Sequence, residues 1–222
     1  MLPQRLRVAM AGDKMHKLGG LLAAESPDDL YRRLISHWQD PQQLVIGGHE
    51  PATWAQRETD KASLAGFAER MMLADQLGYL PDDILAKVDR AAMGVSLETR
   101  IPFLDREVVE FSWRVPLAMK IRDGQGKWLL RQVLHRYVPR ALFERPKMGF
   151  SIPLDAWLRG PLREWAESLL DEAKLRREGY LDPAPIRHCW DEHLSGRRNW
   201  QYRLWNVLMF EAWLADEAAG GQ

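Results

Sequence analysis

The sequence predicts a mainly helical protein. Apolar residues recur at helical spacing in most segments, and helix-start signals such as Ser26-Pro27 precede some of these segments. No run of alternating apolar and polar residues is long enough to predict a strand. The ten tryptophans stand largely at helical spacing in the second half of the chain, and we interpret them as large core side chains.

The composition excludes several classes of protein. The chain has 222 residues, 46% hydrophobic and 28% charged, which is enough for one domain and does not indicate disorder. Its 31 Lys and Arg balance 31 Asp and Glu, so we expect no general attraction to nucleic acid. The apolar runs are far shorter than the roughly 20 residues that cross a bilayer, and MLPQRLRVAM lacks the apolar core of a signal peptide. With the single Cys189, no internal disulfide is possible, and we expect a cytoplasmic protein without a membrane partner.

In the first part of the chain, one helix is predicted. Gly19 and Gly20 are expected to break any helix before it. Ser26 is the expected N-cap, and the helix is expected to run from Pro27 to about Gln39, followed by a polar loop. We treat residues 1–63 as a partial N-terminal segment and residues 64–222 as the helical main part.

The main part is predicted to hold a series of helices bounded by Gly and Pro. Helical periodicity returns at Leu64 and is expected to stop at Gly78, and Pro81 is expected to open a new helix. Asp123-Gly124-Gln125-Gly126 is typical of a tight polar turn. Further helices are predicted over 105–113 and 127–138, and from Leu154 onward with breaks at Gly160-Pro161, Gly179, Asp182-Pro183 and Ser195-Gly196.

Three segments concentrate charge beside apolar residues. In residues 80–93, Asp83 and Lys87 stand four apart and share a helix face, and Arg90 follows Lys87 by three. An exposed face with ion pairs is the ordinary alternative for such a pattern.

The second segment, residues 96–105, surrounds an apolar patch with Glu98, Arg100 and Asp105. We expect these charges to be partly buried, which would require that they pair. A helix-end ion pair is the alternative here. In the third segment, residues 144–150, Arg145 and Lys147 bracket a rigid proline and Gly149 allows close backbone approach, which suits a polyphosphate or a developing negative charge.

In this order, the three segments resemble the asparagine synthetase family. The matching text is LPDDILAKVDRAAM, SLETRIPFLD and RPKMGF, with LRGPLREW downstream, and the resemblance covers roughly residues 64–215. It implies the helical C-terminal portion of an adenine-nucleotide α-hydrolase-like (ATP pyrophosphatase) α/β domain, with most of the parallel sheet missing.

The resemblance also implies a reaction. Aspartate attacks the α-phosphate of ATP to give a β-aspartyl-adenylate and pyrophosphate, and ammonia, released from glutamine in a separate N-terminal domain, then displaces AMP to give asparagine. Lys147 is the implied catalytic residue, with Asp83, Lys87, Arg145 and Gly149 at the substrate and nucleotide pocket. The implied scaffold of this pocket is Asp89, Arg90, Glu98, Arg100 and Asp105.

ATP and Mg²⁺ are implied, but their main binding loops are not in this sequence. The family's Ser-Gly-Gly-x-Asp-Ser loop is absent, as is its second acidic Gly-rich loop, and Cys189 is not the N-terminal cysteine that the glutaminase half needs. We therefore expect a fragment that is inactive alone. A related amide ligase of the β-lactam synthetase type and a non-catalytic helical interaction module remain alternatives.

Two other clusters favour structural roles. His188, Cys189, Asp191, Glu192 and His193 lack further ligands at zinc-like spacing, so an ordinary helix and no metal site is predicted. Residues 195–203 mix arginines with aromatics, as in sites for single-stranded nucleic acid, but the balanced net charge favours a helix start. Trp200, Leu204 and Leu208 are expected in the core, and so is the stripe Trp205, Met209 and Trp213.

Overall fold

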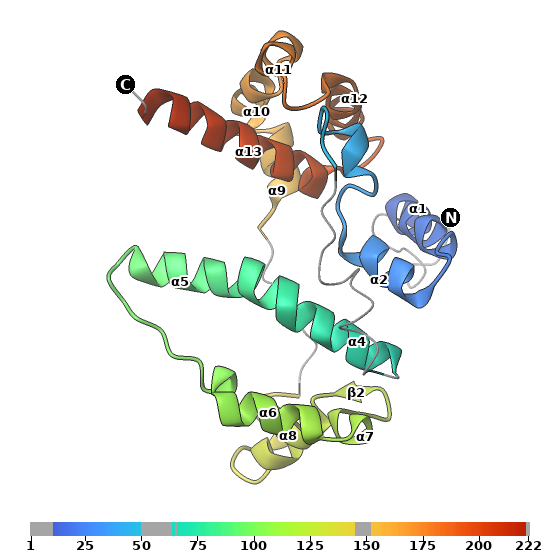
Figure 1. The fold of residues 1–222 in the computed structure, drawn as a ribbon, viewed down its shortest axis with the longest axis vertical. Coiled ribbons are helices and arrows are strands. Elements are labelled where there is room, and N and C mark those ends of the chain that lie inside the picture. The colour runs from blue at the N-terminus through green and yellow to red at the C-terminus, as the bar shows by residue number, and fades with distance from the viewer. Residues whose placement is uncertain (1–10, 50–63, 65, 145–151, 221–222) are drawn as a thin grey trace. The chain divides into compact units, whose positions relative to one another are not determined.

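The computed structural model describes residues 11–49, 64, 66–144 and 152–220. As the sequence predicts, the described chain is mainly helical (Figure 1). It divides into two compact units, which we call the terminal unit (Met1–Ala52 with Ser151–Gln222) and the central unit (Thr53–Phe150). Within the described ranges, no helix combines the length and the apolar character needed to cross a membrane.

The terminal unit joins the two ends of the chain. Its elements are α1 (Ala11–Leu22), α2 (Pro27–Ile35), η2 (Pro41–Gln43), α9 (Leu154–Arg159), α10 (Arg163–Leu169), α11 (Glu172–Glu178), α12 (Pro183–Leu194) and α13 (Gln201–Gly220). The breaks at Gly160-Pro161, Gly179, Asp182-Pro183 and Ser195-Gly196 are confirmed. A further break, between α10 and α11, follows from Asp171, whose side chain accepts a hydrogen bond from the Lys174 N–H at 2.8 Å and so caps α11.

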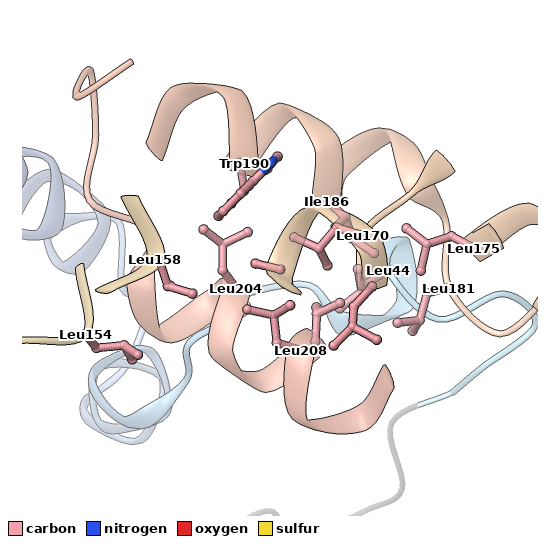
Figure 2. Packing of buried hydrophobic residues seen from close by; sticks show 14 residues of the cluster. Leu44, Leu154, Leu158, Leu170, Leu175, Leu181, Ile186, Trp190, Leu204 and Leu208 are labelled. Atoms are coloured by element: carbon pink, nitrogen blue, oxygen red, sulfur yellow. The ribbon is translucent and has the colours of Figure 1, made fainter. Parts of the chain in front are cut away.

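The hydrophobic core of the described chain lies in the terminal unit. Apolar side chains from α9 to α13 pack together there, with Trp190 among them (Figure 2). Leu158, Leu170, Leu175, Ile186, Trp190, Leu204 and Leu208 are completely buried. Burial of one such side chain contributes about 1.5–3 kcal/mol, so this cluster is the main source of stability in the unit.

A segment near the N-terminus is fixed to this core by backbone hydrogen bonds. The Asp182 N–H donates to the Leu44 carbonyl at 2.8 Å, and the Ile46 N–H donates to the Tyr180 carbonyl at 2.9 Å. The Leu44 side chain is buried in the cluster. The residues after α2 thus belong to the same core as the C-terminal helices.

Helix α2 begins as predicted and ends early, whereas the expectation for α1 was wrong. Ser26 caps α2, accepting a hydrogen bond from the Asp29 N–H at 3.1 Å, and the helix ends at Ile35 rather than near Gln39. Helix α1 runs through Gly19 and Gly20. Each glycine costs only about 1 kcal/mol relative to alanine, so the pair weakens the helix without ending it.

The central unit consists of short elements. They are α4 (Phe67–Ala74), η4 (Asp75–Leu85), α5 (Ala86–Met93), η5 (Pro102–Leu104), α6 (Arg106–Arg114), α7 (Leu117–Lys120), β1 (Ile121–Arg122), β2 (Gln125–Gly126), α8 (Trp128–Leu134) and η6 (Arg140–Leu142). The predicted turn at Asp123-Gly124 is confirmed, with φ of 50° and 72°, and it joins β1 and β2 as a small antiparallel hairpin. Each strand has only two residues, which is too short to show an alternating pattern in the sequence.

The prediction that Gly78 ends one helix and Pro81 opens another was wrong. Helices α4, η4 and α5 follow one another without a break and form one rod (Figure 1). The stretch η4 is π-helical and contains Pro81. Its wider turn bonds each N–H to a carbonyl five residues back, which relieves the clash between a proline ring and the preceding turn.

The predicted core of α13 is partly confirmed. Leu204 and Leu208 are buried, and Trp200 and Trp205 pack against the cluster. Met209 and Trp213 were predicted to be core residues but are 39% and 55% exposed. The core cluster covers only one face of this long helix. Of the stripe Trp205, Met209 and Trp213, only Trp205 packs against the cluster.

Candidate functional site

The first charged segment lies on the long rod of the central unit. Asp83 is near the end of η4 and Lys87 is on the first turn of α5. The Lys87 Nζ lies 2.5 Å from the Asp83 Oδ1, and both side chains are open to solvent, 68% and 38% exposed. The hydrogen bond to Asp83 raises the pKa of Lys87, so Lys87 is a firmly protonated cation.

The second segment carries another exposed ion pair. The Arg100 Nη2 lies 2.5 Å from the Glu98 Oε1, with side chains 82% and 68% exposed. The expectation that these charges are partly buried was therefore wrong. Residues 97–101 precede η5 without regular structure, and in the described chain nothing covers them.

A cavity of about 630 Å³ brings the two segments together. Its walls combine apolar residues such as Leu85, Val88 and Leu104 with three charged residues, Asp89 from α5 and Arg100 and Asp105 from the second segment. The lining of this cavity does not include Asp83, Lys87, Arg90 or Glu98. The structure therefore brings part of the predicted scaffold together at one cavity. The Asp83–Lys87 pair lies outside its lining, whereas the Glu98–Arg100 pair contributes Arg100 to it.

Asp105 has a clear structural role in this wall. Its carboxylate accepts hydrogen bonds from the backbone N–H groups of Glu107 at 2.9 Å and Val108 at 3.4 Å. It thereby caps α6 and fixes the direction of the chain after Pro102. The helix predicted from Asp105 to Trp113 is confirmed, and the geometry favours a scaffold role over a reacting one.

The third segment lies mostly outside the described residues. Arg145, Lys147 and Gly149 all fall there, so their places in the site stay predictions. In the described part of the two other segments, Lys87 and Arg100 are both already paired with carboxylates.

The described residues also do not supply a magnesium site. Across residues 11–49, 64, 66–144 and 152–220, no three His, Cys, Asp or Glu side chains gather closely enough to hold a metal ion.

The cluster of His and Cys on α12 forms packing contacts. Burial lowers the pKa of His193 to about 4, and its Nδ1 accepts the Trp200 N–H at 3.2 Å. Burial raises the pKa of the Cys189 thiol, which packs in the core. Glu192 accepts a hydrogen bond from the Trp200 Nε1 at 2.8 Å, which lowers the pKa of the carboxyl.

Sequence reasoning missed a buried ion pair in the same unit. Glu211 of α13 is 1% exposed and binds Lys174 of α11, which also lies 3.1 Å from the Glu178 carboxylate. Burial raises the pKa of Glu211, whereas the hydrogen bond from Lys174 opposes that effect. Residues 174 and 211 are too distant in sequence for spacing to indicate the pair.

Comparison with known proteins assigns the chain to a family. The model of the asparagine synthase family matches residues 2–215, which is nearly the whole chain. The chain belongs to the asparagine synthase family. The resemblance of its three charged segments to that family is thereby confirmed.

Named relatives agree with this assignment. A putative glutamine-hydrolysing asparagine synthetase of Mycobacterium tuberculosis is 40% identical over 148 residues, which are 66% of this chain and 22% of the relative. Glutamine-hydrolysing asparagine synthetase 1 of Bacillus subtilis is 30% identical over 144 residues, 65% of this chain and 22% of the relative. The human asparagine synthetase is 28% identical over 143 residues, 55% of this chain and 24% of the relative.

This member of the asparagine synthase family spans only 22% of the length of the first two of these relatives. No solved structure shows a significant match to it.

Proposed function

We propose that this chain contributes to ATP-dependent asparagine synthesis of the glutamine-hydrolysing type. In this proposal aspartate is activated as a β-aspartyl-adenylate, and ammonia derived from glutamine displaces AMP. One observation carries the proposal: the family match extends over residues 2–215 and includes the two segments that meet at the cavity of Asp89, Arg100 and Asp105.

The proposed fold is the helical C-terminal portion of an adenine-nucleotide α-hydrolase-like domain, formed by residues 64–222. The mainly helical structure of the described residues is consistent with this portion of an α/β domain. Aspartate, ATP and ammonia are the proposed substrates, and the glutaminase and nucleotide-loop regions are the proposed protein partners. We place the complete enzyme in the cytoplasm and assign Mg²⁺ mainly to loops that this sequence lacks.

Each predicted residue has a proposed role. Lys147 is the catalytic residue, which places a positive charge where negative charge develops at the α-phosphate. Asp83, Lys87, Arg145 and Gly149 border the nucleotide. The scaffold consists of residues on the rod and in the second segment: Asp89, Arg90, Glu98, Arg100 and Asp105.

A chimera tests the proposal. The region of the Bacillus subtilis relative that matches this chain is replaced by this chain, and asparagine and AMP are measured with aspartate, ATP, Mg²⁺ and either glutamine or ammonia. We expect aspartate-dependent AMP and asparagine formation by the chimera and none by the isolated chain, because the phosphate loop that positions ATP is supplied only in the chimera.

Other outcomes of this experiment favour the alternatives. AMP formation that requires a carboxylate other than aspartate would favour a related amide ligase. A chimera that folds, binds ATP and forms no AMP would indicate a non-catalytic helical module.

A further inference from the structure

A groove of about 440 Å³ lies on the terminal unit. None of the residues that line it belongs to the three charged segments. It lies among the end of α1, the end of α2 with the residues that follow, and the residues that lead into α13. The residues that matter to its chemistry are Arg33, His37, Arg198, Trp200, Tyr202 and Arg203. We call it the arginine groove.

Several contacts hold the walls of the arginine groove in place. The Arg203 Nε donates to the His37 carbonyl at 2.7 Å, and the Trp38 Nε1 donates to the Arg203 carbonyl at 3.2 Å. The His37 ring stacks on the Tyr202 ring with centroids 5.5 Å apart. Because Trp38 also packs against the core, the residues after α2 and the start of α13 form one fixed surface.

The groove is positively charged. It is lined by three arginines and by no Asp or Glu. Arg33 is neutralised by Asp29, whose Oδ2 lies 2.8 Å from its Nε. In the described chain, no carboxylate lies within ion-pair distance of Arg198 or Arg203. Glu192 is the carboxylate that Arg198 influences from farther away, and Arg198 contributes to the lowered pKa of that carboxyl.

These two arginines are instead held against aromatic rings. The Arg203 guanidinium lies 4.2 Å from the centroid of Trp200 and 5.2 Å from that of Trp38, and the Arg198 guanidinium lies 5.1 Å from Trp200. Both arginines are half-buried. Aromatic faces orient a guanidinium but do not neutralise it, so its remaining N–H groups are prepared to donate to an anion.

The shape of the groove restricts the anion. Guanidinium forks bind phosphate and carboxylate oxygens in pairs, and phosphate offers more oxygens to several arginines at once. The volume lies within the usual range for small-molecule sites, about 300–1,000 Å³, and exceeds what a lone phosphate would fill. Tyr202, which is 53% exposed, supplies a ring beside the charges on which a planar group can stack.

We propose that the arginine groove binds a small phosphate ester that carries a planar ring, such as a nucleoside monophosphate. Arg198 and Arg203 bind the phosphate, and the ring stacks at Tyr202. This site is separate from the adenylation chemistry proposed above and does not depend on it.

Calorimetric titration of the chain with UMP and with inorganic phosphate tests the proposal. UMP is chosen because adenine nucleotides could also report on the proposed active site. We expect UMP to bind with a dissociation constant below about 1 mM and at least tenfold more tightly than inorganic phosphate. Arg198→Gln should weaken UMP binding at least tenfold, because it removes one fork without removing a core contact.

Further variants separate this site from general charge effects. Arg177→Gln, on the exposed side of α11, is the matched control and should change UMP affinity less than twofold. Tyr202→Ala should lower the affinity for UMP toward that for phosphate. Thermal unfolding of each variant checks that the fold is intact. Arg203→Lys is a second test, because it keeps the positive charge but removes the paired N–H donors of the guanidinium.

Three results would overturn the proposal. The first is no binding of UMP or phosphate by the wild-type chain, and the second is an equal loss of affinity in Arg177→Gln. The third is tight binding of an eight-nucleotide DNA strand that persists in Arg198→Gln, since that would indicate a wider nucleic-acid surface.

Discussion

At the scale of single residues, Lys87 and Arg100 in the first two charged segments are both paired in the structure. Lys87 and Arg100 each hold an exposed carboxylate, and such surface pairs contribute little to stability. Lys147 lies outside the described residues; in the sequence it follows Pro146, a residue type that restricts the backbone, and precedes Gly149, a residue type that permits close backbone approach. The resemblance to the family makes Lys147 the proposed catalytic residue, and a lysine on a restricted backbone would lose less entropy than a free one when directed at a phosphate.

In the chimera, Lys147→Ala should abolish most of the adenylation. Groups that stabilise developing charge contribute roughly 3–4 kcal/mol to the transition state, so aspartate-dependent pyrophosphate release should slow by two to three orders of magnitude. Aspartate binding and glutamine hydrolysis should remain near wild type. Lys120→Ala, outside the three segments, is the matched control. A slowing of less than about threefold would show that another lysine acts, and Lys87→Ala would be measured next.

His193 makes the terminal unit sensitive to pH. Burial lowers its pKa from 6.5 to about 4. Between these two pH values His193 is therefore protonated in the unfolded chain but largely neutral in the folded chain. Stability should therefore be fully present above pH 6.5 and fall progressively down to about pH 4. Between pH 7 and pH 5, this one residue should account for a loss of about 2 kcal/mol in the free energy of unfolding.

Denaturant unfolding at pH 7 and pH 5 measures this effect. His193→Asn keeps a side-chain acceptor for the Trp200 N–H but does not titrate, so its loss of stability on acidification should be smaller than that of the wild type. His188→Asn changes an exposed histidine on the same helix and should keep the wild-type pH dependence. Identical pH dependence in the wild type and His193→Asn would contradict this assignment.

At the scale of elements, side-chain caps and tight turns were predicted better than the effect of Gly and Pro inside a helix. Ser26, Asp105 and the Asp123-Gly124 turn were identified because a side chain or a positive φ acts within a few residues. The course of the helix through Gly78 and Pro81 was not, because a π-helical turn accommodates a proline that would end an α-helix. Helix propensity alone gave the wrong outcome at Gly19 and Gly20, because a helix can continue through residues that each disfavour it by only about 1 kcal/mol.

The cap of α11 gives a test at this scale. Asp171→Ala removes the acceptor for the Lys174 N–H and should lower the free energy of unfolding of the terminal unit by about 1 kcal/mol. Asp171→Asn keeps an acceptor and should cost much less. Urea unfolding monitored by tryptophan fluorescence compares the two. Equal stability of Asp171→Ala and wild type would mean that the break between α10 and α11 does not depend on this cap.

The candidate site was also only partly predictable, because local sequence patterns are visible in the sequence and tertiary packing is not. The segments that carry Asp89, Arg100 and Asp105 were recognised from the order of their letters, and two of the three segments do meet at one cavity. Exposure was not predictable, since it depends on what covers a segment. Glu98 and Arg100 look partly buried in sequence because apolar residues follow them, but the described chain leaves those residues uncovered as well.

At the scale of the whole molecule, burial is unequal between the two units. All but one of the buried residues in the described chain belong to the terminal unit, and the exception is Ala74 of α4. In the central unit, large apolar and aromatic side chains are open to solvent; examples are Tyr79, Val95, Phe103, Phe111, Tyr137 and Leu142, each 55–80% exposed. Exposed apolar surface on this scale marks an interaction surface or a tendency to aggregate.

We therefore expect the isolated chain to self-associate through the central unit. Light scattering during size-exclusion chromatography should show species larger than the monomer, and the chain should bind a dye that reports apolar surface. Hydrogen exchange should be slow in α12 and α13, where the core lies, and fast in α5 and α6, which contain no buried residue among those described.

The variant Phe111→Glu tests whether the chain self-associates through the exposed apolar surface of the central unit. Phe111 is 59% exposed on α6, so a charge there should raise the monomer fraction without lowering the unfolding temperature of the terminal unit. Arg114→Glu, an exposed change on the same helix, is the control for added negative charge and should leave the apolar surface and its dye binding as they are. A chain that is monomeric at high concentration, binds no dye and unfolds in one sharp transition would contradict the prediction. In that case the central unit would have a stable packing of its own, and its apolar side chains would need no other surface to cover them.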